Sequence, residues 1–233
     1  MMFYLKQSIK SPARLTGTTV LVHETLDQVA QPRLAWVYNS GQRRVRRAPQ
    51  IAYDGPGTAA DGLRTTDNWD MYNGATDKYD WTLVGKQEKL IPYNSFKFAD
   101  NKVKYDDLLM AGHANPEMTR YEKHRVWVVE ANLKEGERHI YAKRTFYIDE
   151  DTWQIGVIDH YDGRGELWRV AEAHQLQYTA DTVPWTAGEI IHDLQSGRYL
   201  AMNLTNEEKA INFTSAAKHK DYTPAALRRA AKR

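Results

Sequence analysis

The sequence predicts a mainly β protein with short helices, built on an antiparallel sheet. The chain is rich in strand-forming aromatics, with 7 tryptophans and 14 tyrosines among 233 residues. In its apolar runs, large side chains occupy alternate positions, which is the period of a β-strand. Turn-forming residues rather than helices separate most of these runs, and this spacing is typical of an antiparallel meander. We therefore expect one β domain over residues 1–233.

The N-terminal part predicts two strands followed by a hairpin. Residues 1–9 and 15–26 are predicted as the strands, and residues 34–54 as the hairpin. Trp36 and Tyr38 alternate with smaller residues, so their large side chains share one face of the first hairpin strand. An Asn-Ser-Gly turn follows, because asparagine and glycine tolerate positive φ.

The second hairpin strand is very basic. It carries Arg43, Arg44, Arg46 and Arg47. Pro49 ends this strand or places it at a sheet edge, because proline has no N–H for the ladder. An aromatic face beside an arginine-rich rim suggests a surface for a ligand that is partly apolar and partly anionic. The alternative is a core hairpin with a solvated charged edge, and the sequence alone favours that alternative.

Two short helices are predicted between strands. The run DGPGTAADGL at 54–63 is a loop, because it is dense in glycine and proline. Thr66 and Asp67 offer a helix cap, which predicts a helix near Asp67–Gly74. A second short helix is predicted over Tyr105–Gly112. We expect the two helices to form a lid over the sheet.

The C-terminal two thirds of the chain predict further strands. These cover residues 77–91, 124–133, 140–149, 153–161, 166–178 and 198–204. Residues 185–194 fit either a helix or a strand. Thr223 and Pro224 then predict a helix start, so that residues 222–233 form an exposed basic helix or tail.

Composition excludes several classes of function. The chain has no cysteine, which rules out disulfides, thiolate zinc sites and cysteine nucleophiles. Its formal net charge is only +2, whereas dedicated nucleic-acid binders usually carry a strong basic excess, so we expect no nucleic-acid partner. No stretch approaches the roughly 18 apolar residues that a membrane-spanning helix needs.

No catalytic or metal-binding motif stands out. The sequence lacks a P-loop, a G-x-S-x-G run and paired histidines at metal-ligand spacing. His139, His160 and His174 are therefore predicted to be solvated or hydrogen-bonded. The acidic residues Asp67, Asp70, Asp77 and Asp80 do not fit the calcium-binding EF-hand pattern. We accordingly predict no enzyme, no cofactor and no metal.

Aromatic and aliphatic strand faces are what remain as a candidate site. If one sheet curves, these side chains converge on its concave side, where an incompletely closed sheet leaves an apolar cavity. A fully packed sheet would instead use them as core, which the sequence alone favours. The candidate residues are Trp36, Tyr38, Trp81, Leu83, Trp127, Val129, Phe146, Ile148, Trp153, Ile155, Val157 and Trp168.

Several long phrases resemble a family of Gram-negative exported proteins that is grouped with the outer-membrane lipoprotein-sorting (LolA/LolB-like) fold. The phrases are LAWVYNSGQRRVRRAPQIAYD at 34–54, DNWDMYNG and YDWTLVGKQE within 67–88, the run from RVWVVEANL to GELWRV at 125–170, and DLQSGRYLAMNL at 193–204. Together they cover most of the chain. The resemblance implies a strongly curved antiparallel sheet, or half-open β-barrel, with a helical lid.

The same resemblance implies a function in the cell envelope. It predicts a non-enzymatic periplasmic or outer-membrane-associated protein that binds a lipid, an acyl chain or a lipidated protein. In this reading the four arginines meet anionic head groups or a membrane surface. The alternative is a protein–protein scaffold of an envelope transport complex with a filled barrel. The chain starts in strand-like sequence without a signal peptide, so we expect it to be the C-terminal part of a longer exported protein.

Overall fold

The computed structural model describes residues 1–48, 51–214 and 216–230. The chain divides into two compact units, which are considered separately below. The terminal unit combines Met1–Gly55 with Thr214–Arg233, and the central unit is Pro56–Phe213. The prediction of one domain over residues 1–233 stays a prediction. None of the described helices is long and apolar enough to span a membrane.

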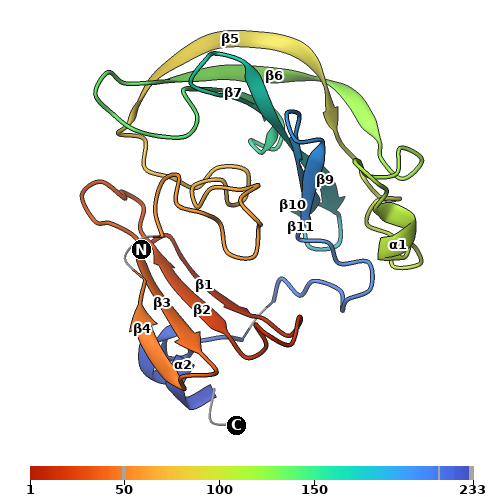
Figure 1. Ribbon diagram of the computed structural model, residues 1–233. Coiled ribbons are helices and arrows are strands. Elements are labelled where there is room, and N and C mark those ends of the chain that lie inside the picture. Colours follow the sequence, from red (N-terminus) through yellow and green to blue (C-terminus); the bar gives the residue numbers. More distant parts are fainter. Residues whose placement is uncertain (49–50, 215, 231–233) are drawn as a thin grey trace. The chain divides into compact units, whose positions relative to one another are not determined.

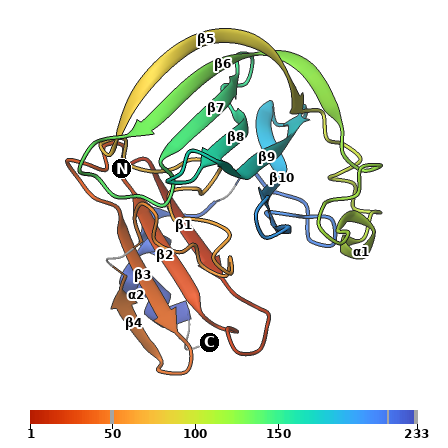
Figure 2. The same ribbon diagram turned by 45° about the horizontal axis from the view of Figure 1, so that its top comes forward.

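The described part of the terminal unit contains one four-stranded antiparallel sheet in the order β1-β2-β3-β4 (Figures 1 and 2). The strands are β1 (Phe3–Ser8), β2 (Thr19–Glu24), β3 (Leu34–Asn39) and β4 (Arg44–Arg47). A 3₁₀ turn, η1 (His219–Tyr222), and the helix α2 (Pro224–Ala230) complete the unit. This arrangement confirms the predicted hairpin over β3 and β4. Pro49 lies outside the described residues.

Helix α2 covers one face of this sheet. Its Leu227 is buried with Leu21 of β2 and Tyr38 of β3, and Trp36 packs against the same cluster. The helix starts where Thr223 and Pro224 predicted it, because Thr223 Oγ1 accepts the Ala226 N–H and proline suits the first turn. The C-terminal helix was expected to be exposed, but Leu227 is buried. Residues 231–233 lie outside the described part of the chain.

The described part of the central unit contains a seven-stranded antiparallel sheet in the order β11-β10-β9-β8-β7-β6-β5. Its strands are β5 (Tyr79–Pro92), β6 (Tyr121–Leu133), β7 (Lys143–Asp149), β8 (Ile155–Tyr161), β9 (Leu167–Tyr178), β10 (Val183–Asp193) and β11 (Arg198–Met202). Figure 1 shows the long β5 and β6 arching together. The meander confirms the predicted fold class, and β10 shows that the segment at 185–194 is strand up to Asp193.

This sheet curls strongly without closing. A bulge between Leu83 and Gly85 bends β5, whose far end then approaches β8 and β9. Just beyond β5, the Ser95 N–H donates to the Gln175 carbonyl of β9 at 2.9 Å. A Cβ at Gly156 of β8 would lie only 3.2 Å from the Ile91 Cβ, so glycine permits this approach. The sheet is thus a half-open barrel with β5 and β11 as its edges.

The two faces of the curled sheet bury separate cores. One face, called the Ile190 face, packs Ile91, Val126 and Val157 together. Further along, this face is covered by segment 93–118, which includes the one-turn helix α1 (Tyr105–Leu108). The opposite face, called the Phe146 face, is covered at one end by loop 56–78.

The predicted helix over Asp67–Gly74 is wrong. The segment consists of turns, in which Asp70 and Met71 have φ of 50° and 61°. Side chains satisfy the backbone here instead of a helix ladder, since Asn68 Nδ2 donates to the Met71 carbonyl. The other predicted lid helix, over Tyr105–Gly112, is confirmed for the single turn of α1.

Candidate functional site

An apolar row crosses all described strands of the central sheet on the Phe146 face. Antiparallel partners share a face, so the register identifies the row directly. It runs from β5 to β11 through Leu83, Val129, Phe146, Ile158, Ala171, Ile191 and Leu200. Such an uninterrupted row requires cover on this face, because apolar surface is costly to leave in water.

Loop 56–78 covers the middle of this row. Met71 of the loop is buried in the same cluster as Phe146, Ile158 and Ile191. The Tyr72 ring lies edge-on to the Phe146 ring with centroids 5.3 Å apart. The loop therefore supplies core side chains that no strand provides.

The part of the Phe146 face nearest the bulge in β5 is less covered. We call it the open end, and it comprises Leu83, Trp127, Val129, Ile148 and Ile155. Leu83 is 62% exposed, and the other four side chains are half-buried. Trp127 pairs in register with Ile148, which pairs with Ile155. The Lys86 ammonium lies 4.3 Å above the Trp127 ring and also pairs with Glu150 at 2.6 Å, so an ion pair borders this apolar surface.

A row of ionisable residues lies beside the apolar row. From β7 to β11 it consists of Arg144, His160, Arg169, Asp193 and Arg198. All but Arg198 are buried. Each buried arginine has its own carboxylate: Asp67 for Arg144 at 2.6 Å and Asp193 for Arg169 at 3.0 Å. The buried charges are thus paired, as burial requires.

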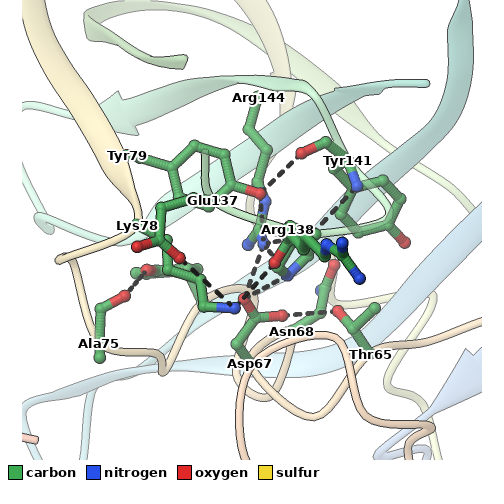
Figure 3. Close-up of polar contacts among 12 residues, drawn as sticks. Thr65, Asp67, Asn68, Ala75, Lys78, Tyr79, Glu137, Arg138, Tyr141 and Arg144 are labelled. Atoms are coloured by element: carbon green, nitrogen blue, oxygen red, sulfur yellow. Dashed lines mark hydrogen bonds and ion pairs between the residues drawn. The ribbon is translucent and has the colours of Figure 1, made fainter. Parts of the chain in front are cut away.

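Asp67 of loop 56–78 is the centre of the contacts around Arg144 (Figure 3). Its Oδ2 accepts from Arg144 Nη2 and lies 3.1 Å from His139 Nε2, while its Oδ1 accepts the Thr65 hydroxyl at 2.6 Å. Burial alone would raise the pKa of Asp67. The Arg144 charge and the hydrogen bonds from His139 and Thr65 outweigh burial and hold this pKa well below its usual range.

Asp67 and His139 are the residue types of a catalytic dyad, but protein contacts occupy both side chains. His139 Nδ1 accepts the Tyr141 N–H at 3.0 Å, while Nε2 lies 3.1 Å from Asp67 Oδ2 and 2.7 Å from Arg144 Nη2. Both ring nitrogens of His139 therefore contact protein groups, whereas a general base needs a ring nitrogen that faces the substrate. Both Asp67 and the His139 side chain are also buried. This geometry fixes loop 56–78 to the sheet, and we call the contacts of Asp67 with Arg144 and His139 the clasp.

Aromatic rings surround the Arg144 guanidinium. The ring centroids of Tyr72, Tyr79 and Tyr141 lie 5.3, 5.0 and 5.2 Å from its central carbon. His160 stacks on the Tyr141 ring at 4.3 Å, and burial lowers its pKa well below the usual range, so it is neutral at pH 7. Cation–π contacts of this kind offset part of the cost of burying the arginine.

Sequence reasoning missed Arg144 and treated Asp67 as a helix cap. One signal was available for Arg144. It lies two residues before Phe146 in a strand, so alternation places its charge on an apolar, buried face. A charge at such a position requires a partner. Its partner Asp67 is 77 residues away in sequence, and spacing alone could not identify it.

Seven predicted ligand-binding residues lie together on the Phe146 face. They are Trp81, Leu83, Trp127, Val129, Phe146, Ile148 and Ile155. Trp168, at a bulge in β9, also joins this side, because its Nε1 donates to Asp193. Alternation identifies residues that share a face, but it cannot tell which face turns inward when both are apolar.

The other four candidates lie elsewhere. Trp36 and Tyr38 belong to the terminal unit, where they pack with Leu21 and Leu227. Val157 is on the Ile190 face. Trp153 lies in the turn between β7 and β8 and is 69% exposed. The twelve candidate residues therefore do not share one face of one sheet.

The four predicted head-group arginines are exposed but do not form one patch. Arg44 and Arg46 pair with Asn39 and Val37, whereas Arg47 pairs with Trp36 on the α2 side. Arg43 is in the turn between β3 and β4 with a φ of 52°. Alternation along β4 thus divides the cluster between the two faces of the sheet.

One group in the described part of the chain has the ligand atoms for a metal ion. His124, Asp149 and Asp151 each place one such atom within 4.8 Å of the others. However, His124 Nδ1 lies 2.9 Å from Asp149 Oδ1, and Thr152 donates to Asp149 Oδ2. A hydrogen-bonded turn between β7 and β8 accounts for this group.

Comparison with known proteins finds a matching family model and a relative in sequence. A family model described as "Protein of unknown function (DUF1329)" matches residues 1–228. The uncharacterized protein PA3922 of Pseudomonas aeruginosa is 67% identical over 228 residues, which are 97% of this chain and 50% of that protein. The chain thus spans about half the length of the curated relative it matches.

Two solved structures share the fold at low sequence identity. A domain from Vibrio parahaemolyticus, described provisionally as an outer membrane lipoprotein-sorting protein, has a TM-score of 0.63 at 16% identity and aligns with 96% of this chain and 76% of its own. A DUF1329 family protein from Desulfovibrio piger has a TM-score of 0.61 at 17% identity, with the same coverage. These likenesses confirm the predicted lipoprotein-sorting type of fold.

Proposed function

The chain belongs to the DUF1329 family, and from this premise we propose that it is a non-enzymatic protein of the cell envelope that binds a lipid or another hydrophobic ligand. The shared fold with a lipoprotein-sorting domain supports the proposal at the level of architecture. We further propose a periplasmic or outer-membrane-associated location and a longer parent protein, since the chain spans 50% of its relative.

The observation that carries the proposal is the open end of the Phe146 face. Its apolar side chains form two adjoining rows across β5 to β8, yet Leu83 is 62% exposed. Covering this surface with an acyl chain would gain roughly 25 cal/mol for each Å² of apolar area removed from water.

The buried contacts around Arg144 support binding rather than catalysis. Each side-chain oxygen of Asp67 and each ring nitrogen of His139 already meets a protein group. The clasp they form holds loop 56–78 against the apolar row, beside the open end. In the proposed function this loop is the inner wall of the ligand site.

A second candidate is a protein–protein scaffold with a filled barrel. It is favoured by the packing of the Ile190 face, where Ile91, Val126 and Phe98 are fully buried within the central unit. In that case the open end would contact a protein partner, such as a lipidated protein or a component of an envelope transport complex.

Trp127→Glu tests the ligand site, and Trp153→Glu is its matched control. Both variants replace tryptophan by a carboxylate, but only Trp127 lies at the open end. We expect Trp127→Glu to weaken binding of a fluorescent fatty acid at least about tenfold, because its charge would be desolvated by the ligand. Trp153→Glu should bind like the parent. Equal binding by two folded variants would contradict the proposed site.

Native mass spectrometry of the purified chain, followed by lipid analysis of an organic extract, separates the two candidate functions. A bound lipid near stoichiometric amount supports the carrier and names its class. A ligand-free mass that persists after fatty acids and phospholipids are added supports the scaffold.

A further inference from the structure

A hollow in the terminal unit has the chemistry of an anion site. It has a volume of about 610 Å³ beside β1, β2 and α2. Three cationic side chains line it, namely Lys6, Lys10 and Arg43, and its described lining contains no carboxylate. No ion pair recorded within the described residues involves these three cations.

Hydroxyl groups line the same hollow between the cations. Ser8 of β1 and Thr19 of β2 share a hydrogen bond of 3.1 Å, and Ser40 lies in the turn after β3. Within the Ser8–Thr19 pair one hydroxyl donates to the other, which leaves one O–H of the pair to rotate towards an anion. Cations together with hydroxyl donors are the groups that proteins use to bind phosphate oxygens.

Contacts between two loops fix the wall of the hollow. Ser40 Oγ donates to the Thr16 carbonyl at 2.7 Å, which joins loop 9–18 to the turn between β3 and β4. A Cβ at Gly17 would lie 3.0 Å from the Ser40 Cβ, and Gly17 has a φ of 81°, so glycine is required for this close approach. The site is thus held in shape before any ligand binds.

We propose that this hollow binds the phosphate group of an amphiphile. The floor is apolar, because Ile9, Tyr38 and Leu227 contribute to it, while the cations supply the charge. An amphiphile of this class places its phosphate among the cations and its first apolar atoms on the floor. The site is distinct from the open end of the Phe146 face, which lies in the other unit. It does not depend on the function proposed for that end.

Charge reversal within the hollow tests this proposal against a matched control. Lys6→Glu with Arg43→Glu changes the net charge by the same amount as Arg44→Glu with Arg46→Glu. Arg44 and Arg46 do not line the hollow, and β4 alternation places them on the opposite face of the sheet. All these side chains are exposed, so both double variants should fold. Binding of the full chain to phosphatidylglycerol vesicles is measured by sedimentation, with phosphatidylcholine vesicles for comparison.

We expect the Lys6/Arg43 variant to lose at least about tenfold in affinity for phosphatidylglycerol vesicles, and the Arg44/Arg46 variant to lose much less. An equal loss in both variants would show that only the net charge matters, and it would overturn the proposal. The proposal would also be overturned if the parent bound no vesicles and did not respond to glycerol phosphate. NMR titration with soluble glycerol phosphate identifies the source of the phosphate. Shifts at Lys6 and Thr19 without vesicle binding would assign the site to a free phosphate ester.

Discussion

Glu189 of β10 is a carboxylate buried beneath loop 56–78. It is 1% exposed, and its oxygens accept the Met71 N–H at 3.3 Å and the Asn203 side-chain N–H at 2.7 Å. Burial raises the pKa of Glu189 to about 7, and the nearby Asp70 adds to this shift. The loop therefore rests on a group that changes its charge near neutral pH.

Glu189→Gln should remove a pH dependence of stability. With a pKa of 4.5 unfolded and about 7 folded, Glu189 is protonated in the folded state and ionised in the unfolded state between these values. The folded state then binds more protons, so the free energy of unfolding falls as pH rises from 4.5 to 7. We expect this loss to reach about 3 kcal/mol in the parent and to vanish in the variant.

Denaturant unfolding at pH 5 and pH 8 checks this expectation by difference. Buried His160 and His174 act in the opposite direction, because burial lowers the pKa of each. Their contribution is common to both proteins and cancels when the variant is subtracted from the parent. Identical pH profiles in parent and variant would refute the role of Glu189.

At the scale of elements, loop 56–78 depends on the charge of Asp67. Asp67→Asn leaves the buried Arg144 guanidinium without its carboxylate. Removing one partner of a buried ion pair typically costs about 3–5 kcal/mol. We expect the loop to open more often, so that amide exchange accelerates across residues 65–73 and a hydrophobic dye binds more strongly to the uncovered apolar row.

Asp61→Asn is the matched control for the loop. Asp61 belongs to the same loop and pairs with Arg198, but its side chain is 87% exposed. Exposed pairs contribute only about 0–1 kcal/mol, so exchange in the loop should stay near that of the parent. Unchanged exchange in Asp67→Asn, measured by hydrogen–deuterium exchange mass spectrometry, would contradict the clasp.

Local sequence pattern predicts the strands well and the loop poorly. The alternation from Arg125 to Leu133 lies within β6, because each side chain there meets neighbours two residues apart on the same face. Asp67, by contrast, has partners at 139 and 144. These long-range contacts override the local helix signal, since capping by Thr66 and Asp67 is weaker than a buried charge pair.

Curvature was the second feature that local pattern could not supply. The run YDWTLVGKQE contains both the predicted strand face with Trp81 and the bulge at Gly85. A glycine in a strand marks a possible bulge. It does not say towards which face the strand will bend.

At the scale of the whole molecule, the two ends of the chain build one unit. Residues 1–55 supply its sheet, and residues 214–233 supply the helix that covers one face. Leu227 is 2% exposed and packs with Leu21 and Tyr38, which lie about two hundred residues earlier in the chain. Stability of the terminal unit should therefore depend on the last helix.

Leu227→Ala should destabilise the terminal unit selectively. Truncating a buried leucine typically costs about 2–5 kcal/mol, because transfer energy is lost and a cavity remains. We expect faster amide exchange throughout β1–β4 and little change in β5–β11, since Leu227 packs in the core of the terminal unit. Arg228→Ala, which removes an exposed neighbour on the same helix, should leave both units unchanged. If exchange accelerates equally in both sheets, the units unfold together, and their division has no energetic meaning.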